Sequence, residues 1–286
     1  MPDSVDVEQY LERIGLRGPV RPDLETLNTI LFAHATTVPF ENLDVLLGRP
    51  IELTPDALFQ KIVVRRRGGY CFEQNGLLLH LFRTIGFTVT PLSARVRYQR
   101  PREYTPPRTH LFLRVEIDDV PWVADCGVGS MSLTGAFRFD LEGEQRTPHE
   151  PRRIIRENGV FFHQVRLGDA WHDVLEFTGE EMHPIDRELA NWYTSAHPLS
   201  HFKSRLVAAR ALADGGRLSL LNRELTRRGP DGQAVSHMLR TPAELLVVLE
   251  REFGMHFPAD TLFRCDALDW PAAADSTTPD ERRADA

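Results

Sequence analysis

The chain has 286 residues, 42% hydrophobic and 26% charged, which is enough for two or three globular domains with cores of their own. Its formal net charge of −7 argues against general nucleic-acid binding, and no apolar run approaches the roughly 18–20 residues that span a bilayer. Three cysteines without paired spacing argue against a disulfide framework, and there is no CxxC or HExxH motif to indicate zinc. Because a cationic and apolar leader is also missing, we expect a cytoplasmic protein, as a monomer or weak homo-oligomer, with no metal and no nucleic-acid or membrane partner.

Helical patterns dominate residues 1–87, which we expect to form a helical domain that carries the functional cysteine described below. Apolar residues recur at the spacing of one helix face within the segment 23–35. Thr54 and Pro55 form a good helix start, because threonine caps free N–H groups and proline fits the first helical position.

The most informative segment is residues 66–76, with the sequence RRGGYCFEQNG. Two glycines allow a sharp backbone turn, and the residues that follow read as a helix that ends at Gly86. Cys71 is then at a helix N-terminus, where unsatisfied N–H groups and the helix dipole favour the nucleophilic thiolate. A single cysteine among apolar residues is more often a small core residue, so the assignment depends on its partners.

The candidate partners of this thiol are His110 and Asp125. Apolar residues alternate from His110 to Ile117, as in a β-strand, and the segment 122–127 reads as a returning strand. A two-residue loop after Ile117 would place Asp125 opposite Phe112, on the sheet face that His110 shares. Because Pro121 lacks an N–H it could lengthen the loop, so we predict either a loop with an even number of residues or a compensating bulge. Each residue alone could be structural, but together with the thiol they supply a nucleophile, a base and an orienting group.

The rest of the chain divides by its pattern. Short alternating strands separated by turn residues fill residues 88–183, which we expect to form a β-barrel-like domain carrying His110 and Asp125. Residues 184–202 look like a connecting segment, and residues 203–270 mix strands with one helix, from Pro242 to Gly254, in an α/β domain. Residues 271–286 lack large apolar side chains, so we expect a disordered tail.

Several motifs, in their order and spacing, resemble the arylamine N-acetyltransferase family over roughly residues 8–265. They include the family's N-terminal signature, its nucleophile motif, its histidine and aspartate positions, a later block and a strand of its last domain. The matching segments are 38–43 (VPFENL), 67–75 (RGGYCFEQN), Thr109-His110, Asp125, 191–198 (NWYTSAHP), 200–202 (SHF) and Leu221-Asn222-Arg223.

The resemblance implies an α+β fold with an N-terminal helical domain, a central β-barrel-like domain and a C-terminal α/β lid around a cysteine-protease-like catalytic core. It implies acetyl-CoA-dependent N-acetylation of small aromatic amines or hydrazines, through an acetyl-cysteine and a ping-pong mechanism, without a tightly bound cofactor. The catalytic residues would be Cys71, His110 and Asp125. The oxyanion of the tetrahedral intermediate would be bound by the Cys71 N–H, with a contribution near Thr109.

Substrate contacts also follow from the resemblance. The substrate-binding residues would be Phe40, Tyr70, Thr109, Val128 and Phe202, and the residues that contact acetyl-CoA would be Gly129 and Ser130. The run from Gly127 to Ser130 is by itself a weak phosphate-binding pattern. Many relatives carry an aromatic residue where this chain has Val128, which changes the expected amine preference.

Three alternatives remain compatible with these residues. An amide synthase would use the same triad to take an acyl chain from a carrier protein and close a macrolactam. A cysteine hydrolase of the protease or transglutaminase type would cleave peptides or release ammonia without CoA. A binding protein that kept the fold would leave Cys71 no more reactive than Cys126 or Cys265.

Overall fold

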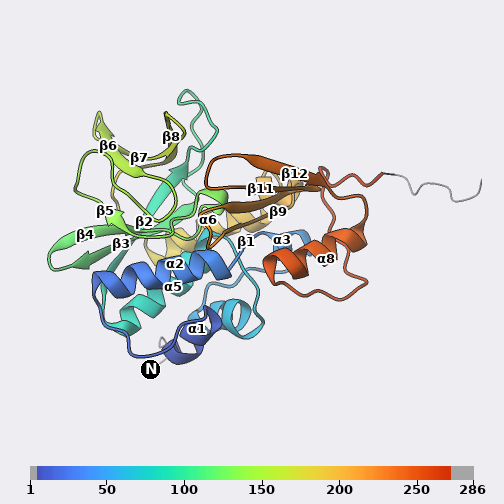
Figure 1. Ribbon diagram of the computed structural model, residues 1–286, viewed down its shortest axis with the longest axis horizontal. Coiled ribbons are helices and arrows are strands. Elements are labelled where there is room, and N and C mark those ends of the chain that lie inside the picture. Colours follow the sequence, from blue (N-terminus) through green and yellow to red (C-terminus); the bar gives the residue numbers. More distant parts are fainter. Residues whose placement is uncertain (1–4, 272–286) are drawn as a thin grey trace, which may run out of the picture.

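The computed structural model describes residues 5–271, which fold into three adjoining parts (Figure 1). N-terminal helices lie beneath a seven-stranded, barrel-like sheet, and a five-stranded sheet with helix α8 (Pro242–Phe253) lies beside them. This arrangement confirms the predicted α+β fold class with a helical part, a barrel-like part and a C-terminal α/β part. In the described part of the chain, no helix is long and apolar enough to cross a membrane.

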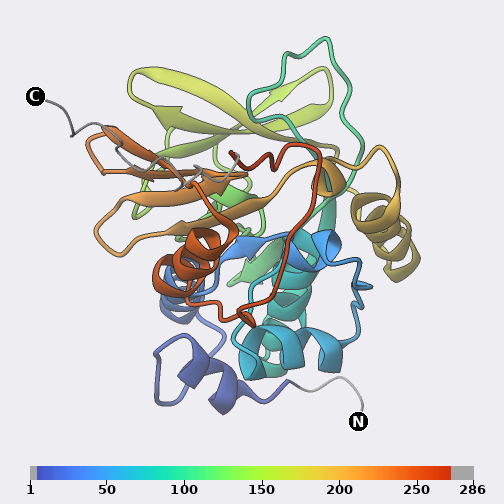
Figure 2. The ribbon, with the colours of Figure 1, turned by 90° about the vertical axis from the view of Figure 1, so that its right-hand side faces the viewer.

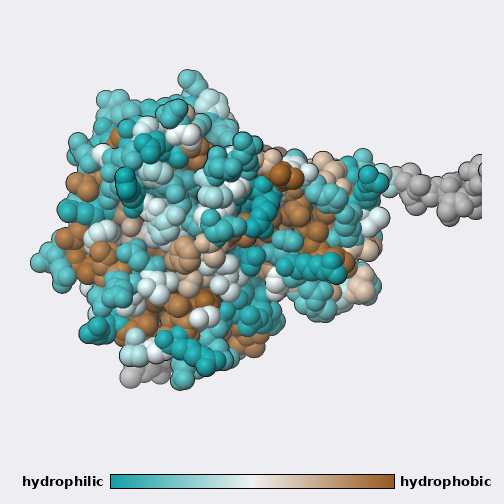
Figure 3. Space-filling view, in the orientation of Figure 1, coloured by the Kyte–Doolittle hydropathy of each residue, from teal (hydrophilic) through white to brown (hydrophobic). Residues whose placement is uncertain are grey.

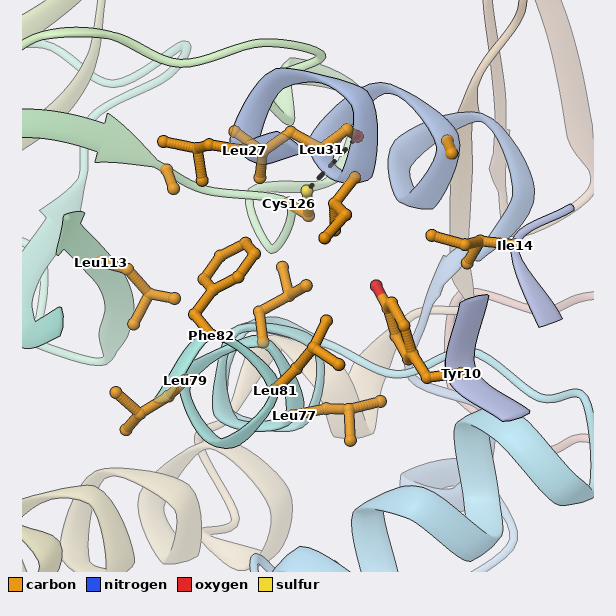
Figure 4. Close-up of a cluster of buried hydrophobic side chains, with 14 of the residues drawn as sticks. Tyr10, Ile14, Leu27, Leu31, Leu77, Leu79, Leu81, Phe82, Leu113 and Cys126 are labelled. Carbon is orange, nitrogen blue, oxygen red and sulfur yellow. Dashed lines mark hydrogen bonds between the residues drawn. The ribbon is translucent and has the colours of Figure 1, made fainter. Parts of the chain in front are cut away.

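The helical part contains the nucleophile segment. The side chains of Asp23 and Thr54 cap the starts of α2 and α4, as the sequence predicts for Thr54. Figure 4 shows how the apolar faces of α1, α2 and α5 meet in one core, with Leu31 and Phe82 on facing helices. The helical segments are α1 (Val7–Arg13), α2 (Leu24–Thr37), α3 (Leu43–Leu46), α4 (Pro55–Phe59), the π-helical turn η1 (Gln60–Val64) and α5 (Cys71–Ile85).

Helix α5 begins at Cys71 and is terminated by Gly86 at its C-cap, both as predicted. The Glu73 carboxylate accepts the Tyr70 N–H at 3.0 Å, which satisfies a donor that the helix start leaves free. Gly86 has φ 108°, the left-handed conformation that glycine adopts without steric cost. Cys71 therefore occupies the first helical position, where its own N–H has no acceptor within the helix.

The barrel-like sheet is antiparallel between all neighbouring strands and has the order β5-β4-β3-β2-β8-β7-β6. Its core is a separate cluster that includes Phe112, Phe137 and Phe177. The strands are β2 (Thr88–Val96), β3 (His110–Ile117), β4 (Val120–Ala124), β5 (Phe137–Arg138), β6 (Arg152–Glu157), β7 (Val160–Leu167) and β8 (Ala170–Phe177).

The hairpin of β3 and β4 has the predicted register. Ile117 pairs with Val120, and Leu113 pairs with Ala124, so the next residue, Asp125, lies opposite Phe112. The two residues of the loop have positive φ values of 51° and 59°, as in a tight two-residue hairpin turn, and they are Asp118 and Asp119. Pro121 does not lengthen the loop, because it lies within β4 and pairs with Glu116.

The five-stranded sheet joins the C-terminal part to the helical part, because its first strand, β1 (Phe40–Glu41), comes from the N-terminal region and pairs with β9. Figure 2 shows this sheet and α8 packed beside the barrel and above the helices. The other strands are β9 (Val207–Ala211), β10 (Arg217–Leu221), β11 (Glu224–Arg228) and β12 (Ala234–Met238).

The segment 184–202, for which no secondary structure was predicted, contains helix α6 (Pro184–Ala196) and the start of the short helix α7 (His201–Ser204). One sequence-based interpretation needs correction. Asn222 and Arg223 are not strand residues but the two-residue turn between β10 and β11, with Asn222 at φ 54°. Except for Pro271, the predicted disordered tail lies outside the described residues.

Candidate active site

The loop before Cys71 packs unusually closely against the Pro39 backbone and the Glu73 side chain. A Cβ atom on Gly68 would lie 1.9 Å from the Pro39 carbonyl oxygen, and one on Gly69 would lie 2.7 Å from the Glu73 side chain. Neither glycine has a positive φ, so both are required by close approach rather than by a left-handed turn. The loop is joined to β1 by the Glu41 N–H, which donates to the Gly69 carbonyl at 3.1 Å.

A buried cluster of charged side chains holds this loop against the start of α5. Lys61 Nζ lies 2.6 Å from Glu73 Oε1 and 2.8 Å from Asp44 Oδ2, while Arg67 Nη2 lies 2.7 Å from Glu41 Oε1. Burial raises the pKa of Glu73 to about 6, although Lys61 opposes this. Burial also opposes ionisation of Asp44, but Lys61 and Arg67 outweigh it and hold that pKa at about 2. Removing one partner would leave a buried charge uncompensated, so the cluster fixes the loop geometry.

Asp125 and His110 meet on one face of the hairpin. Asp125 Oδ2 accepts a hydrogen bond from His110 Nε2 at 2.7 Å, and both side chains are buried. Burial lowers the pKa of His110, but the Asp125 carboxylate and the contact with the Cys71 sulfur outweigh burial and raise this pKa to about 10. The ring is therefore protonated at neutral pH and stabilises negative charge on its neighbours.

Cys71 completes the group from the helix side. Its thiol lies 3.6 Å from the Thr109 carbonyl oxygen, and the residue is 5% exposed. Since Asp125 occupies His110 Nε2, Nδ1 is the ring nitrogen that remains for the sulfur. The two residues predicted from the hairpin and the cysteine predicted from the helix start are thus brought together.

Asn75 ties this group together, and the sequence reasoning gave it no role. It lies one turn after Cys71 on α5 and is fully buried. Its Nδ2 donates to Asp125 Oδ1 at 2.8 Å and to the Leu111 carbonyl at 2.7 Å, while its Oδ1 accepts the Cys126 N–H at 3.0 Å. One amide therefore joins the nucleophile helix to β3 and to the end of β4. The only feature of the sequence that could have indicated this role is the spacing, because a residue four positions after Cys71 lies on the same face of the helix.

The predicted substrate-binding residues fall into two groups. Phe40, Tyr70 and Phe202 share an apolar cluster with Cys71, with ring centroids 5.3 Å apart for Tyr70 and Phe202 and 6.0 Å apart for Phe40 and Phe202. Tyr70 is fully buried and donates a hydrogen bond from its hydroxyl group to Asn191. Its ring packs edge-to-face against the Phe202 ring.

Val128 and the two predicted CoA contacts lie beyond Asp125. Val128 is half-buried and packs against the barrel core cluster rather than the cluster of Cys71. Gly129 and Ser130 belong to the 3-10 turn η2 (Gly129–Met131). Gly129 faces Phe40, because a Cβ atom there would lie 3.7 Å from the Phe40 ring. In the described part of the chain, no group of three or more His, Cys, Asp or Glu side chains could hold a metal ion.

Comparison with known proteins identifies this arrangement. A family model described as N-acetyltransferase matches residues 23–262. The chain belongs to the arylamine N-acetyltransferase family. It is 39% identical over 247 residues to the arylamine N-acetyltransferase / N-hydroxyarylamine O-acetyltransferase of Salmonella typhimurium, covering 86% of this chain and 87% of that protein. It is also 39% identical over 259 residues to the arylamine N-acetyltransferase of Mycolicibacterium smegmatis, covering 88% and 92%.

A solved structure extends the comparison to the fold of this acetyltransferase. The arylamine N-acetyltransferase of Mycobacterium marinum, determined in complex with CoA, superposes with a TM-score of 0.83 at 34% identity. The match covers 87% of this chain and 93% of that chain. The α+β fold is therefore the fold of an enzyme family, and the chain is an acetyltransferase.

Gly127 is a position of this enzyme at which a single methyl group should have a large effect. A Cβ atom on Gly127 would lie 2.5 Å from Cys71 Cα and 2.8 Å from Asn75 Nδ2, so the loop after β4 would have to move away from α5. We expect Gly127→Ala to lower the free energy of unfolding by roughly 1–3 kcal/mol. We also expect it to slow acetyl transfer about a hundredfold, because the Gly127 N–H positions Asp125 at 2.9 Å.

Gly76→Ala is the matched control for Gly127→Ala, since it lies on α5 and its Cβ atom would meet only the end of the Leu58 side chain, at 3.1 Å. It should be as stable as the wild type or more stable by up to about 1 kcal/mol, because alanine favours the helix. Urea unfolding measures the stability of both variants, and the rate of acetyl transfer measures their activity. Equal behaviour of the two variants would contradict the close packing of Gly127 against Cys71.

A buried histidine should make the enzyme sensitive to acid. His34 accepts from the Tyr10 hydroxyl at 2.7 Å and contacts Gln74 Oε1 at 3.0 Å, while Gln74 in turn binds the Gly69 carbonyl at 2.7 Å. Burial is the main cause that lowers the pKa of His34 from its ordinary value of 6.5 to about 4. Between these two pH values the unfolded chain binds a proton that the folded chain does not.

The stabilisation from a neutral His34 is therefore complete above pH 6.5 and is lost progressively as the pH falls toward 4. It amounts to about 3 kcal/mol by the ordinary conversion of a pKa difference. We expect the free energy of urea unfolding to fall between pH 7 and pH 5, and to fall less in His34→Gln. An identical pH slope in the variant would show that His34 is not the group responsible.

Proposed function

We propose that this enzyme transfers the acetyl group of acetyl-CoA to arylamines and arylhydrazines by a ping-pong mechanism through an acetylated Cys71. The observation that carries the proposal is the contact between His110 Nε2 and Asp125 Oδ2 at 2.7 Å, next to a cysteine at a helix start. The names of the Salmonella and Mycolicibacterium relatives support arylamines as acceptors, and the CoA complex of the Mycobacterium marinum enzyme supports the donor.

In the first half-reaction, the Cys71 thiolate attacks the thioester carbonyl of acetyl-CoA. The oxyanion that forms receives a hydrogen bond from the Cys71 N–H, which has no helical acceptor. A Thr109 contribution would have to come from its N–H, because its carbonyl oxygen, which lies 3.6 Å from the Cys71 sulfur, can only accept hydrogen bonds. The bond to the CoA sulfur then breaks, and protonated His110 gives its proton to the leaving CoA thiolate. Asp125 stabilises the charged ring and orients it.

In the second half-reaction, the amine nitrogen attacks the carbonyl of acetyl-Cys71. Neutral His110 takes the proton from the nitrogen, and the Cys71 thiolate leaves as the amide forms. The charge state of His110 and Cys71 is thereby restored. Transfer rather than hydrolysis requires that water be excluded while the acyl-enzyme waits, and the 5% exposure of Cys71 among Phe40, Tyr70 and Phe202 supports this. Gly129 and Ser130 remain our candidates for contacts with CoA.

The decisive experiment is intact-protein mass spectrometry after brief mixing with acetyl-CoA and no amine. We expect a mass gain of one acetyl group and release of one CoA thiol per chain. Initial-rate plots with an arylamine should then be parallel, whereas intersecting lines would indicate direct transfer in a ternary complex. Acylation only by a carrier-protein thioester would favour the amide synthase, and peptide cleavage without CoA would favour the hydrolase.

Amine selectivity should depend on Val128. A valine leaves more room than an aromatic ring and removes a stacking surface worth about 0.5–1.5 kcal/mol. The enzyme should therefore accept bulky para-substituted amines, and Val128→Phe should shift kcat/KM toward small anilines by up to about tenfold. Val235→Phe, on exposed strand β12, is the control. If Val128→Phe ranks a panel of arylamines as the wild type does, residue 128 does not contact the acceptor.

A further inference from the structure

A short loop after β4 lies directly against Cys71, and we call its residues 126–132 the site loop. Gly127 packs so closely that a Cβ atom there would lie 2.5 Å from Cys71 Cα. The Gly127 N–H also donates to Asp125 Oδ1 at 2.9 Å. The turn η2 within the site loop packs against β1, β9 and β10. The position of the site loop therefore affects both the sulfur and the carboxylate of the triad.

Hydrogen bonds within the site loop fix its shape. The Ser132 hydroxyl donates to the Cys126 carbonyl at 2.8 Å and accepts the Val128 N–H at 3.2 Å. The Leu133 N–H donates to the Asp125 carbonyl at 2.7 Å, which joins the two ends. These bonds link residues that are close together in the chain, so other contacts must set where the site loop lies on the enzyme.

Two side chains from distant segments anchor the site loop, one at each end. At its start, Asn75 on α5 accepts the Cys126 N–H at 3.0 Å through Oδ1. At its end, Arg217 at the start of β10 donates from Nη1 to the Ser132 carbonyl at 2.9 Å. Among residues 5–271, Arg217 is the one residue of the C-terminal part whose side chain donates a hydrogen bond to the site loop. This bond therefore connects the C-terminal part to the surroundings of the triad.

Glu150 holds the Arg217 guanidinium in the orientation that reaches the site loop. Nε lies 2.7 Å from Glu150 Oε1 and Nη2 lies 2.5 Å from Oε2, a bidentate pair that fixes the plane of the guanidinium. Arg152 supports Glu150 from the barrel, with its Nη2 at 3.0 Å from Oε2. Burial raises the pKa of Glu150, but Arg217 and Arg152 outweigh burial and hold this pKa at about 2. The carboxylate is therefore ionised at neutral pH, and the pair leaves Nη1 for the Ser132 carbonyl.

We propose that Arg217 is a positioning residue for acetyl transfer, because its hydrogen bond to Ser132 keeps the site loop against Cys71. The proposal rests on the proposed acetylation of Cys71. Arg217 is 5% exposed and its three guanidinium nitrogens bind Glu150 and Ser132, so it acts through the site loop rather than on a substrate. A small shift of the loop would move the Gly127 N–H away from the carboxylate of the triad, and a displacement of about 1 Å can slow a reaction up to about a hundredfold.

Arg217→Lys tests this positioning role. Lysine keeps the positive charge beside Glu150, but a single ammonium group cannot reproduce the planar fork that reaches three oxygen atoms. We would mix the enzyme with saturating acetyl-CoA and no amine, and follow release of the CoA thiol by stopped flow. The rate constant of this burst should fall about tenfold in Arg217→Lys. A merely structural role would lower the amplitude of the burst, which counts folded enzyme, and leave its rate constant unchanged; that result would overturn the proposal.

Hydrogen–deuterium exchange shows whether the site loop has lost its anchor. Peptides that cover residues 126–132 should exchange faster in Arg217→Lys than in the wild type, and wild-type exchange there would contradict the proposal. Ser132→Ala is a second variant, since it removes both bonds of the hydroxyl inside the loop and leaves Arg217 and Glu150 intact. It should also show faster exchange and a lower burst rate constant. Faster exchange with a wild-type rate constant, in either variant, would show that the position of the loop does not control the reaction.

Arg97→Lys is the matched control. Arg97 is also 5% exposed, its Nε lies 2.6 Å from Glu176 Oε2, and its Nη1 donates to the Pro101 carbonyl at 3.1 Å. It therefore binds a carboxylate and a backbone carbonyl as Arg217 does, but in the loop after β2. The control should lower the unfolding temperature to a similar degree, speed exchange only around residues 97–104 and keep the wild-type burst rate constant. An equal loss of rate in the control would mean that the effect of Arg217→Lys is not specific to the site loop.

The wild-type enzyme separates this proposal from the proposed function. If the wild type releases CoA in a burst and Arg217→Lys releases it equally fast, the positioning role is wrong while the acetyl-enzyme stands. If the wild type forms no acetyl-enzyme, the mechanism through Cys71 fails, and kcat of the overall acetyl transfer replaces the burst in the comparison of Arg217→Lys with Arg97→Lys. A wild-type kcat in Arg217→Lys would then overturn the positioning role as well.

Discussion

Cys71→Ala is expected to leave a folded protein that gains no mass from acetyl-CoA and acetylates no arylamine. The substitution removes the sulfur that lies beside His110 and keeps the Cβ atom, the helix start and the hydrogen bonds of Asn75. Cys71→Ser should also be nearly inactive, because a hydroxyl is far harder to ionise than a thiol. Intact mass after mixing and the thermal unfolding temperature measure chemistry and folding separately.

Cys265→Ser is the control for this pair, because Cys265 is half-buried at a distance from the site and burial raises the pKa of its thiol. It should acylate as the wild type does. An acetyl adduct that persists in Cys71→Ala would show that another residue is the nucleophile.

Local sequence patterns were sufficient to predict those features of the fold that depend only on residues close together in the chain. Thr54 and Gly86 mark helix ends because caps and left-handed glycines act over one turn. The pairing of His110 with Asp125 could be derived because a two-residue loop fixes the register of a hairpin, and register fixes which side chains share a face.

Contacts between distant segments could not be derived in the same way. Nothing in the alternation of residues 40–41 indicates that they add a strand to a sheet formed by residues 207–238. The bonds of Asn75 to Leu111 and Cys126 likewise depend on how a helix and a hairpin pack. Asn75 is part of the nucleophile motif of residues 67–75, but its role becomes visible only in the tertiary structure.

Helix α6 was missed for another reason. Its apolar residues Ile185, Leu189 and Trp192 recur at helical spacing, but they are mostly exposed, and the segment has more polar residues than a core helix. Figure 3 shows a face of the molecule that is largely hydrophilic with separate apolar patches, so a residue's hydropathy alone does not reveal whether it is buried.

Asp125→Asn is expected to preserve the fold and slow acylation of Cys71 by roughly a thousandfold or more, as loss of the orienting carboxylate does in other triads. The reason lies in how the carboxylate is used. Oδ1 accepts two donors, Asn75 Nδ2 at 2.8 Å and the Gly127 N–H at 2.9 Å, while Oδ2 accepts from His110. An asparagine would keep its single oxygen toward the two donors, so its NH2 group would face His110 Nε2.

The NH2 group of the introduced asparagine would reverse the hydrogen bonding of the ring. His110 Nε2 would become an acceptor, the ring proton would move to Nδ1, and the ring could no longer take a proton from the sulfur. The ring would also lose the carboxylate that raises its pKa to about 10. Asp119→Asn is the control, since it makes the same chemical change in the hairpin turn, at φ 59°, where asparagine is equally tolerated. Stopped-flow release of CoA measures both variants, and wild-type acylation in Asp125→Asn would exclude Asp125 from the reaction.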